Sequence, residues 1–201
     1  MDILIATNNK NKVKEYIEIF KDFDINCLSI SDLNIDCDPQ ETGKTFHENS
    51  MIKAKEIAKF TDLPIISDDS GLVIDSLPDI LGVYSHRFMP NNSYNEKCKE
   101  VIKLLENKPR NAHFVCVITL LNFNGETIQF EGISYGNISE EIKGENGFGY
   151  DPIFIPLGYD KTFSELDNEL KNKLSHRGLA SKKLIDFLNE NLFCKNISIK
   201  Q

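Results

Sequence analysis

Two long stretches rich in β-branched and aromatic residues meet at Asn124-Gly125, and this feature constrains the fold more than any other. The stretches are HFVCVITLLNF (113–123) and ETIQFEGISYGNI (126–138). An Asn-Gly dipeptide between two such stretches favours the left-handed backbone of a tight two-residue turn. The sequence therefore predicts a long antiparallel hairpin in the middle of the chain.

Strand and helix patterns alternate on either side of this hairpin. Residues 2–6 (DILIA) predict a short buried strand, and apolar residues at helical spacing predict a helix over 13–23. The remaining patterns predict strands over 25–30, 64–67, 71–77 and 152–156, and helices over 45–60, 94–107 and from Ser175 onward. This order favours an α/β fold: one two-lobed domain over 1–201, with a mixed sheet, flanking helices and a central active-site cleft.

Charge and cysteine content narrow the class of protein. The net charge of −8 argues against a surface for nucleic acid, and no stretch is apolar enough for a membrane span. No CxxC or Cys/His ligand spacing appears, so we expect reduced thiols, no structural zinc and a cytoplasmic protein. The five cysteines are Cys27, Cys37, Cys98, Cys116 and Cys194.

The segment TNNKNK (7–12) joins the first predicted strand to the first predicted helix. Backbone N–H groups at a helix N-terminus attract anions, and Lys10 and Lys12 add positive charge. The alternative interpretation is a solvated turn with surface lysines.

A second basic segment, LKNKLSHRG (170–178), precedes the last predicted helix. His176 and Arg177 would lie in its first turn, where cations oppose the helix dipole. That placement is unfavourable unless an anion lies nearby, so the pair favours a ligand-binding role over a surface charge.

Two adjacent acids, Asp68 and Asp69, follow an apolar run in PIISDDSGL (64–72). We expect the strand to end there, so that both carboxylates reach a cleft. Neighbouring carboxylates repel each other, and a divalent cation such as Mg²⁺ relieves the repulsion. The alternative is an acidic turn, because Asp, Ser and Gly all favour turns.

Two further segments carry possible ligand chemistry. Gly43-Lys44-Thr45 is not a phosphate-binding P-loop, because Asp38 stands where the motif needs a glycine; Glu41 is instead a candidate metal ligand. In GFGYD (147–151) the glycines allow close backbone approach to a ligand, and aromatic rings can stack on a base. The alternative for this loop is a glycine-rich turn with aromatic residues in the core.

Together these segments resemble the inosine triphosphate pyrophosphatases, also called dITP/XTP pyrophosphatases. The resemblance covers nearly the whole chain, with matches in order at ATNNKNK (6–12), ETGKTFHENSMIKAK (41–55), SDDSGL (67–72), GFGYDPIF (147–154) and LSHRG (174–178). It implies a two-lobed α/β fold, usually a homodimer, with the active site in the cleft. It also implies hydrolysis of ITP, dITP and XTP to the monophosphate and pyrophosphate, which clears these nucleotides from the precursor pool.

The resemblance further implies roles for individual residues. Asp69 would be the catalytic acid–base residue, and Glu41, Asp68 and Asp69 would lie at a Mg²⁺ ion. Phe148 would stack on the base. The substrate-binding residues would be Thr7, Asn8, Asn9, Lys10, Lys12, Lys53, Ser70, Phe148, Gly149, Tyr150, Asp151, Lys171, His176 and Arg177. Lys44 and His47 receive no role.

Several points stay open in the sequence. It does not separate Asp68 from Asp69 as base and metal ligand, nor rank ITP, XTP and their deoxy forms. One alternative function is a Mg²⁺-dependent phosphatase that releases orthophosphate, although an aspartyl-nucleophile enzyme would want a DxD pattern where this chain has DDS. Another alternative is a nucleotide-binding regulator without turnover.

Overall fold

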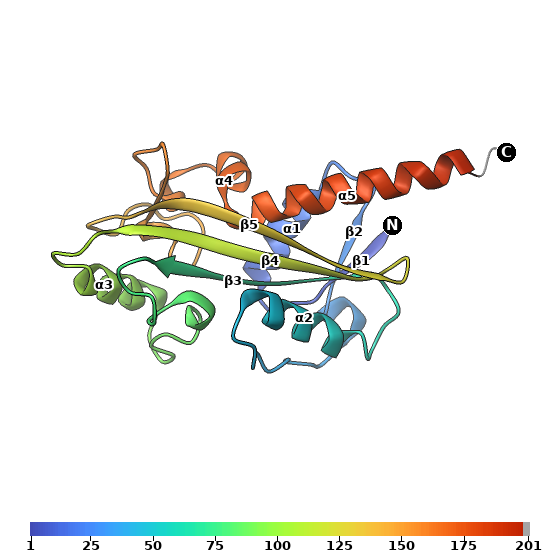
Figure 1. Ribbon diagram of the computed structural model, residues 1–201, viewed down its shortest axis with the longest axis horizontal. Helices are drawn as coiled ribbons and strands as arrows, with labels where there is room; N and C mark the ends of the chain where they lie inside the picture. The colour runs from blue at the N-terminus through green and yellow to red at the C-terminus, as the bar shows by residue number, and fades with distance from the viewer. Residues whose placement is uncertain (199–201) are drawn as a thin grey trace.

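The fold is built on one six-stranded mixed sheet. It is seen in a computed structural model that describes the backbone of residues 1–198 and the side chains of residues 1–191. The strand order is β2-β1-β3-β4-β5-β6 (Figure 1). The strands are β1 (Asp2–Ile5), β2 (Asn26–Ser29), β3 (Ile65–Ile74), β4 (Asn111–Phe123), β5 (Glu126–Ile138) and β6 (Phe154–Pro156). β1 is parallel to β2 and β3, and every later pairing is antiparallel, so the predicted mixed α/β fold is confirmed.

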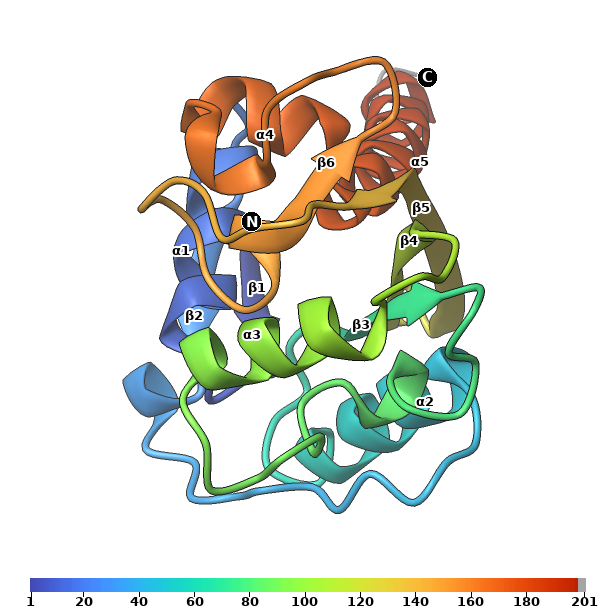
Figure 2. The ribbon, with the colours of Figure 1, turned by 90° about the vertical axis from the view of Figure 1, so that its left-hand side faces the viewer.

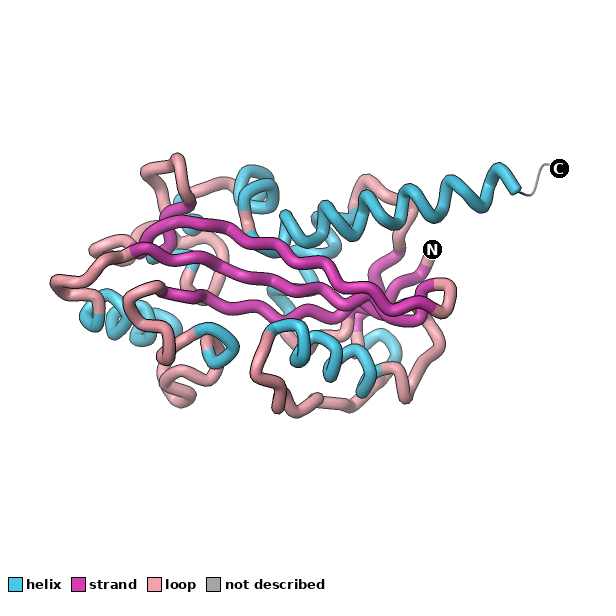
Figure 3. Tube along the Cα trace, in the orientation of Figure 1, coloured by secondary structure: helices cyan, strands magenta, loops and turns pink. Residues whose placement is uncertain are grey.

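The central hairpin forms as predicted. β4 and β5 pair over almost their whole length, and Asn124 and Gly125 have φ angles of 54° and 78°. Two successive positive φ angles are what a tight hairpin turn of this hand requires. The hairpin is the longest part of the sheet and runs along the long axis of the molecule, and the C-terminal helix extends beyond its turn (Figure 3).

Helices pack on both faces of the sheet. α1 (Lys10–Phe20) and α5 (His176–Ser198) lie on one face and α2 (Phe46–Ile57) lies on the other (Figures 1 and 2). α3 (Tyr94–Leu104) closes a third apolar cluster at the end of the sheet near β6. The short helix α4 (Asn168–Leu174) was not predicted, because its polar sequence carries too little apolar periodicity to show.

Capping residues set where the helices begin. Thr45 and Glu48 form a capping box at the start of α2. Ser175 precedes α5 as predicted, and its hydroxyl accepts from the Gly178 backbone N–H at 3.1 Å. α1 begins three residues before the predicted position, because the Asn9 side chain caps it by accepting from the backbone N–H groups of Asn11 and Lys12.

The strand that carries the two acids differs from the prediction. We expected two strands with a break at Asp68-Asp69, but β3 runs unbroken and pairs with β4 from Ile65 to Ile74. Gly71, which suggested a turn, instead permits a close contact: a Cβ there would lie 2.2 Å from the carbonyl oxygen of Gly82. The two acids therefore lie inside a strand, where neighbouring side chains point to opposite faces of the sheet.

Other sequence expectations can be placed on the fold. Cys27, Cys37, Cys98 and Cys116 are free thiols, whereas Cys194 lies beyond the described side chains. Among the described helices, none has the length and apolar character needed to cross a membrane.

The contact at Gly71 gives a first prediction. Gly71→Ala should destabilise the protein by about 1–3 kcal/mol, because a methyl group would overpack β3 against the backbone at Gly82. The free energy of unfolding from urea titration measures this. Gly158→Ala is the control: its Cβ would meet open space, so only the strain of φ 87° remains. A Gly71→Ala protein that unfolds at the parent's urea concentration contradicts the prediction.

Candidate active site

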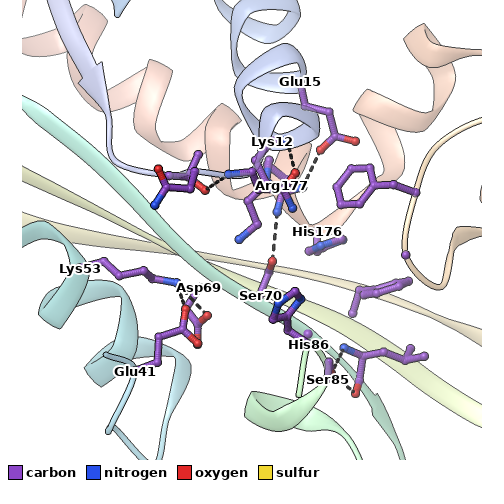
Figure 4. Close-up of a pocket in the computed structure, with 18 of the residues that line it drawn as sticks. Lys12, Glu15, Glu41, Lys53, Asp69, Ser70, Ser85, His86, His176 and Arg177 are labelled. Carbon is purple, nitrogen blue, oxygen red and sulfur yellow. Dashed lines mark hydrogen bonds and ion pairs between the residues drawn. The ribbon is translucent and has the colours of Figure 1, made fainter. Parts of the chain in front are cut away.

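A cleft of about 380 Å³ gathers residues from every segment of the sequence that suggested ligand chemistry (Figure 4). Two of the proposed site residues, Lys10 and Asp68, do not line it. Those that do are Thr7, Asn8, Asn9, Lys12, Glu41, Lys53, Asp69, Ser70, Phe148, Gly149, Tyr150, Asp151, Lys171, His176 and Arg177. The sheet brings these residues together because the turns after β1 and before α5 lie beside the middle of β3.

Asp69 lies in a cluster of two carboxylates around one ammonium group. The Lys53 Nζ atom, on α2, is 3.0 Å from Asp69 Oδ1 and 2.8 Å from Glu41 Oε1. Asn49, which the sequence did not suggest, donates from Nδ2 to Asp69 Oδ2 at 3.1 Å. This cluster faces the cleft, and Figure 4 shows it at one side of the pocket.

Burial and neighbouring charges shift the pKa values of Asp69 and Glu41 in opposite directions. Burial raises the pKa of Asp69; the nearby Lys53 ammonium opposes this, and the Glu41 carboxylate adds to the rise. Burial also acts to raise the pKa of Glu41, but Lys53 outweighs it and the pKa is lowered. Asp69 is therefore the carboxyl of the pair better suited to accept a proton.

Asp68 has a different environment on the opposite face of β3. Its Oδ2 atom is 2.9 Å from Lys12 Nζ and 2.9 Å from Arg177 Nη2, and the side chain is buried. Burial would raise the pKa of Asp68, but Lys12 and Arg177 hold it far below its usual value. Asp68 is thus a permanently ionised anchor for two cations, and the expectation that both acids reach the cleft from a strand end is wrong.

Glu15, on α1, is a site residue that sequence reasoning missed. Its carboxylate is 2.5 Å from Arg177 Nη1 and 2.8 Å from Lys171 Nζ, and it lines the cleft. Lys171 also pairs with the buried Asp151 at 2.8 Å. The spacing of Glu15 three residues after Lys12 was a usable signal, because residues at i and i+3 share one face of a helix.

The loop at 147–151 is held in shape by its own acid. The Asp151 carboxylate accepts from the Phe148 backbone N–H at 2.8 Å, and a Cβ at Gly147 would lie 2.2 Å from that carboxylate. The Phe148 ring lies 5.0 Å from Lys171 Nζ. Tyr150 is buried in the core and donates its hydroxyl hydrogen to the Ser85 carbonyl at 3.0 Å, so it supports the loop.

His176 lies buried at the start of α5, against the ring of Phe114 at a centroid distance of 4.6 Å. Burial lowers its pKa well below the usual value, and the cations Arg177 and Lys171 add to this. The imidazole is therefore neutral, and its buried Nδ1 atom has no hydrogen-bond partner within the protein. The unfavourable position of Arg177 near the helix N-terminus is balanced by Asp68 and Glu15.

Lys10, which was predicted to bind substrate, and Lys44 and His47, which received no role, do not line the cleft. Lys10 is exposed. Lys44 and His47 line a separate shallow hollow between the first turns of α2 and Gln129 of β5. Within the described residues, no group of three or more His, Cys, Asp or Glu side chains is arranged to hold a metal ion.

The sequence and fold were compared with those of known proteins. Residues 3–187 match the model of the Ham1 family. A dITP/XTP pyrophosphatase of Clostridium perfringens is 45% identical over 195 residues, which cover 92% of this chain and 96% of the relative. One of Dictyoglomus thermophilum is 43% identical over 198 residues and 96% of both chains.

Solved structures agree with these relatives. The Ham1 protein of Staphylococcus aureus superposes with a TM-score of 0.84 at 39% identity, covering 95% of this chain and 100% of that one. A HAM1 protein of Coxiella burnetii gives 0.85 at 39% identity, over 94% and 99% of the two chains. The resemblance found in the sequence is confirmed, and the chain belongs to the Ham1 family.

Proposed function

We propose that this protein hydrolyses the triphosphates of deaminated purines, ITP, dITP and XTP, to a nucleoside monophosphate and pyrophosphate. One observation carries the proposal: a single cleft holds a carboxyl with a raised pKa, Asp69, and two buried side chains that can donate hydrogen bonds, His176 and Arg177. The names of the relatives, dITP/XTP pyrophosphatases, support the same reaction.

The carboxylates around Lys53 fit a divalent cation. Glu41 and Asp69 supply hard oxygen donors within reach of one Lys53 nitrogen, and Mg²⁺ prefers a few carboxylates together with phosphate oxygens. When bound, Mg²⁺ would neutralise charge on the phosphate oxygens. Asp68 fits this role less well, since it lies on the other face of β3 and already neutralises Lys12 and Arg177.

The reaction follows from what the cleft residues can do. Lys12, Lys53 and Lys171 would bind the phosphate chain as point charges. Asp69 would take the proton of the water that attacks the α-phosphorus, with Asn49 fixing the orientation of the carboxyl group. Burial raises the pKa of Asp69, whereas a Mg²⁺ ion held by the same carboxylate would lower it, so Glu41, whose pKa is lowered, would carry the larger share of the ion and Asp69 the proton.

Base selection would come from buried donors. The neutral His176 can donate one N–H to a 6-oxo group, and Arg177 can donate only. Adenine presents an amino group at that position, so the donors would be left unpaired at a cost of about 1–3 kcal/mol each. Phe148, beside the cations Lys171 and Arg177, would stack on the purine.

We further propose that the chain acts as a single two-lobed domain, as a cytoplasmic homodimer, and removes these nucleotides before polymerases use them. The test is a panel of ITP, dITP, XTP, GTP and ATP with Mg²⁺, in which pyrophosphate and orthophosphate are assayed separately. The proposal expects pyrophosphate and monophosphate in equal amounts, with ITP, dITP and XTP preferred. Orthophosphate as the first product would indicate a phosphatase, and binding without turnover would indicate a regulator.

Removing the proposed general base, Asp69, should stop hydrolysis of the nucleotide without unfolding the protein. Asp69→Asn should lower kcat for ITP at least about 100-fold, because general-base catalysis contributes roughly 10²–10⁴-fold. Steady-state pyrophosphate release and thermal unfolding measure the two effects. Asp75→Asn, an exposed acid just after β3, is the matched control and should retain parent activity. A near-parent rate for Asp69→Asn would remove Asp69 from the role of base.

Removing the imidazole should weaken base selection. His176→Ala should lower the ratio of kcat/KM for ITP to that for ATP about tenfold, because one donor to the 6-oxo group is lost. His176→Gln keeps an amide donor and should retain more of the ratio. Since His176 packs against Phe114, both variants are first checked for parent-like circular dichroism. An unchanged ratio in folded His176→Ala contradicts the role.

A further inference from the structure

One wall of the cleft is formed by residues 83–87, which begin within the 3₁₀ turn Gly82–Tyr84, together with Tyr94 at the start of α3. Val83, Ser85, His86, Arg87 and Tyr94 from this wall line the same cleft as Asp69 and His176. None of these five residues belongs to the segments that suggested ligand chemistry in the sequence.

Close packing against β3 fixes the position of this wall. The Ser85 hydroxyl accepts from the Leu72 backbone N–H at 3.0 Å and donates to the Gly82 carbonyl at 2.6 Å. The turn can approach this closely only because Gly71 has no side chain. The wall is therefore held two to three residues along β3 from Asp69.

A second set of contacts ties His86 to α3. The His86 carbonyl accepts from the buried ammonium of Lys97 at 2.9 Å, and that ammonium lies 4.8 Å from the centre of the Tyr94 ring. The Tyr94 hydroxyl is 3.3 Å from His86 Nδ1. Tyr94 also meets the Tyr150 ring edge-on at 5.5 Å, which joins the wall to the loop carrying Phe148. Both the backbone and the ring of His86 are thus held in place.

The Tyr94 contact decides which imidazole nitrogen can meet a ligand. Burial raises the pKa of Tyr94, so its hydroxyl keeps its proton. With Nδ1 engaged by this hydroxyl, Nε2 is the nitrogen left to bond a substrate atom. In the tautomer in which Nδ1 accepts from the Tyr94 hydroxyl, the ring carries its proton on Nε2 and donates from there.

The place of His86 along the cleft indicates which part of a nucleotide it meets. In the view of Figure 4, the His86 side chain appears between the Glu41–Asp69 pair and His176, and all four residues line the same cleft. A nucleotide with its reacting phosphate at Asp69 and its base at His176 must pass its sugar through this middle part. The sugar and the α-phosphate both present oxygen acceptors for an N–H donor.

We propose that His86 is a substrate-binding residue that donates from Nε2 to the sugar–α-phosphate segment of the nucleotide, and that Tyr94 is the positioning residue that sets its ring. The proposal rests on the proposed function, since it takes the nucleotide's orientation from it. It predicts a contact with the monophosphate half of the substrate and none with the pyrophosphate half.

Binding of the two products separates these halves without turnover. His86→Ala should weaken IMP binding about five- to tenfold in isothermal titration calorimetry, while pyrophosphate binding changes less than twofold, because one hydrogen bond is lost. His86→Gln, whose amide nitrogen can replace Nε2, should recover part of the affinity. His47→Ala is the matched control, since His47 lies outside the cleft on α2.

The positioning role of Tyr94 is tested by a double-mutant cycle. Tyr94→Phe keeps the ring contacts with Lys97 and Tyr150 and removes only the hydroxyl. It should weaken IMP binding about two- to fivefold alone and have no further effect in the His86→Ala background, because coupled residues are not additive. Equal effects in both backgrounds would overturn the positioning role.

The outcomes also distinguish this inference from the proposed function. If His86→Ala binds IMP as the parent does, or loses IMP and pyrophosphate equally, the assignment of His86 is wrong while the function stands. If the parent binds IMP but releases no pyrophosphate from ITP, the proposed function fails instead, and the product-binding result for His86 is read independently.

Discussion

The ion pairs of Asp68 are the interaction on which the rest of the site depends. One buried carboxylate holds Lys12 of α1 and Arg177 of α5 against the middle of β3. Three elements far apart in the sequence are thereby fixed at one point beneath the cleft. Such a pair is costly to break, because removal of one partner leaves the others buried and uncompensated, at about 3–5 kcal/mol.

The two adjacent acids therefore have opposite tasks, and the strand makes the separation possible. Because β3 continues through them, the pleat directs Asp68 toward α1 and α5 and Asp69 toward α2. On one face strong cation pairing keeps a carboxylate ionised, and on the other burial raises a carboxyl's proton affinity. A turn at this place would have given both acids similar surroundings.

Much of this arrangement was readable from the sequence, and the failures have physical causes. The hairpin follows from the local Asn-Gly signal, whereas most of the cleft residues were predicted through the family resemblance of the segments that carry them. The continuity of β3 does not follow from local signals, because Ser70 and Gly71 favour turns locally, whereas pairing with β4 decides the outcome. Glu15 was missed because its partner Arg177 lies 162 residues away, and the only local signal was its helical spacing from Lys12.

The pairing of cations in the cleft has a consequence for the ligands it can accept. Each of four cations in the cleft already pairs with at least one carboxylate: Lys12, Lys53, Lys171 and Arg177. Most of the positive charge on these four side chains is therefore already neutralised. The protein around the cleft carries a net charge of −8. To bind one of these cations, a small anion would have to break an ion pair with a carboxylate, and its own single charge would replace only that one interaction. A phosphate chain that reaches several of these cations at once would replace several carboxylates as their partners, so its binding would rearrange the charge pairs along the whole cleft.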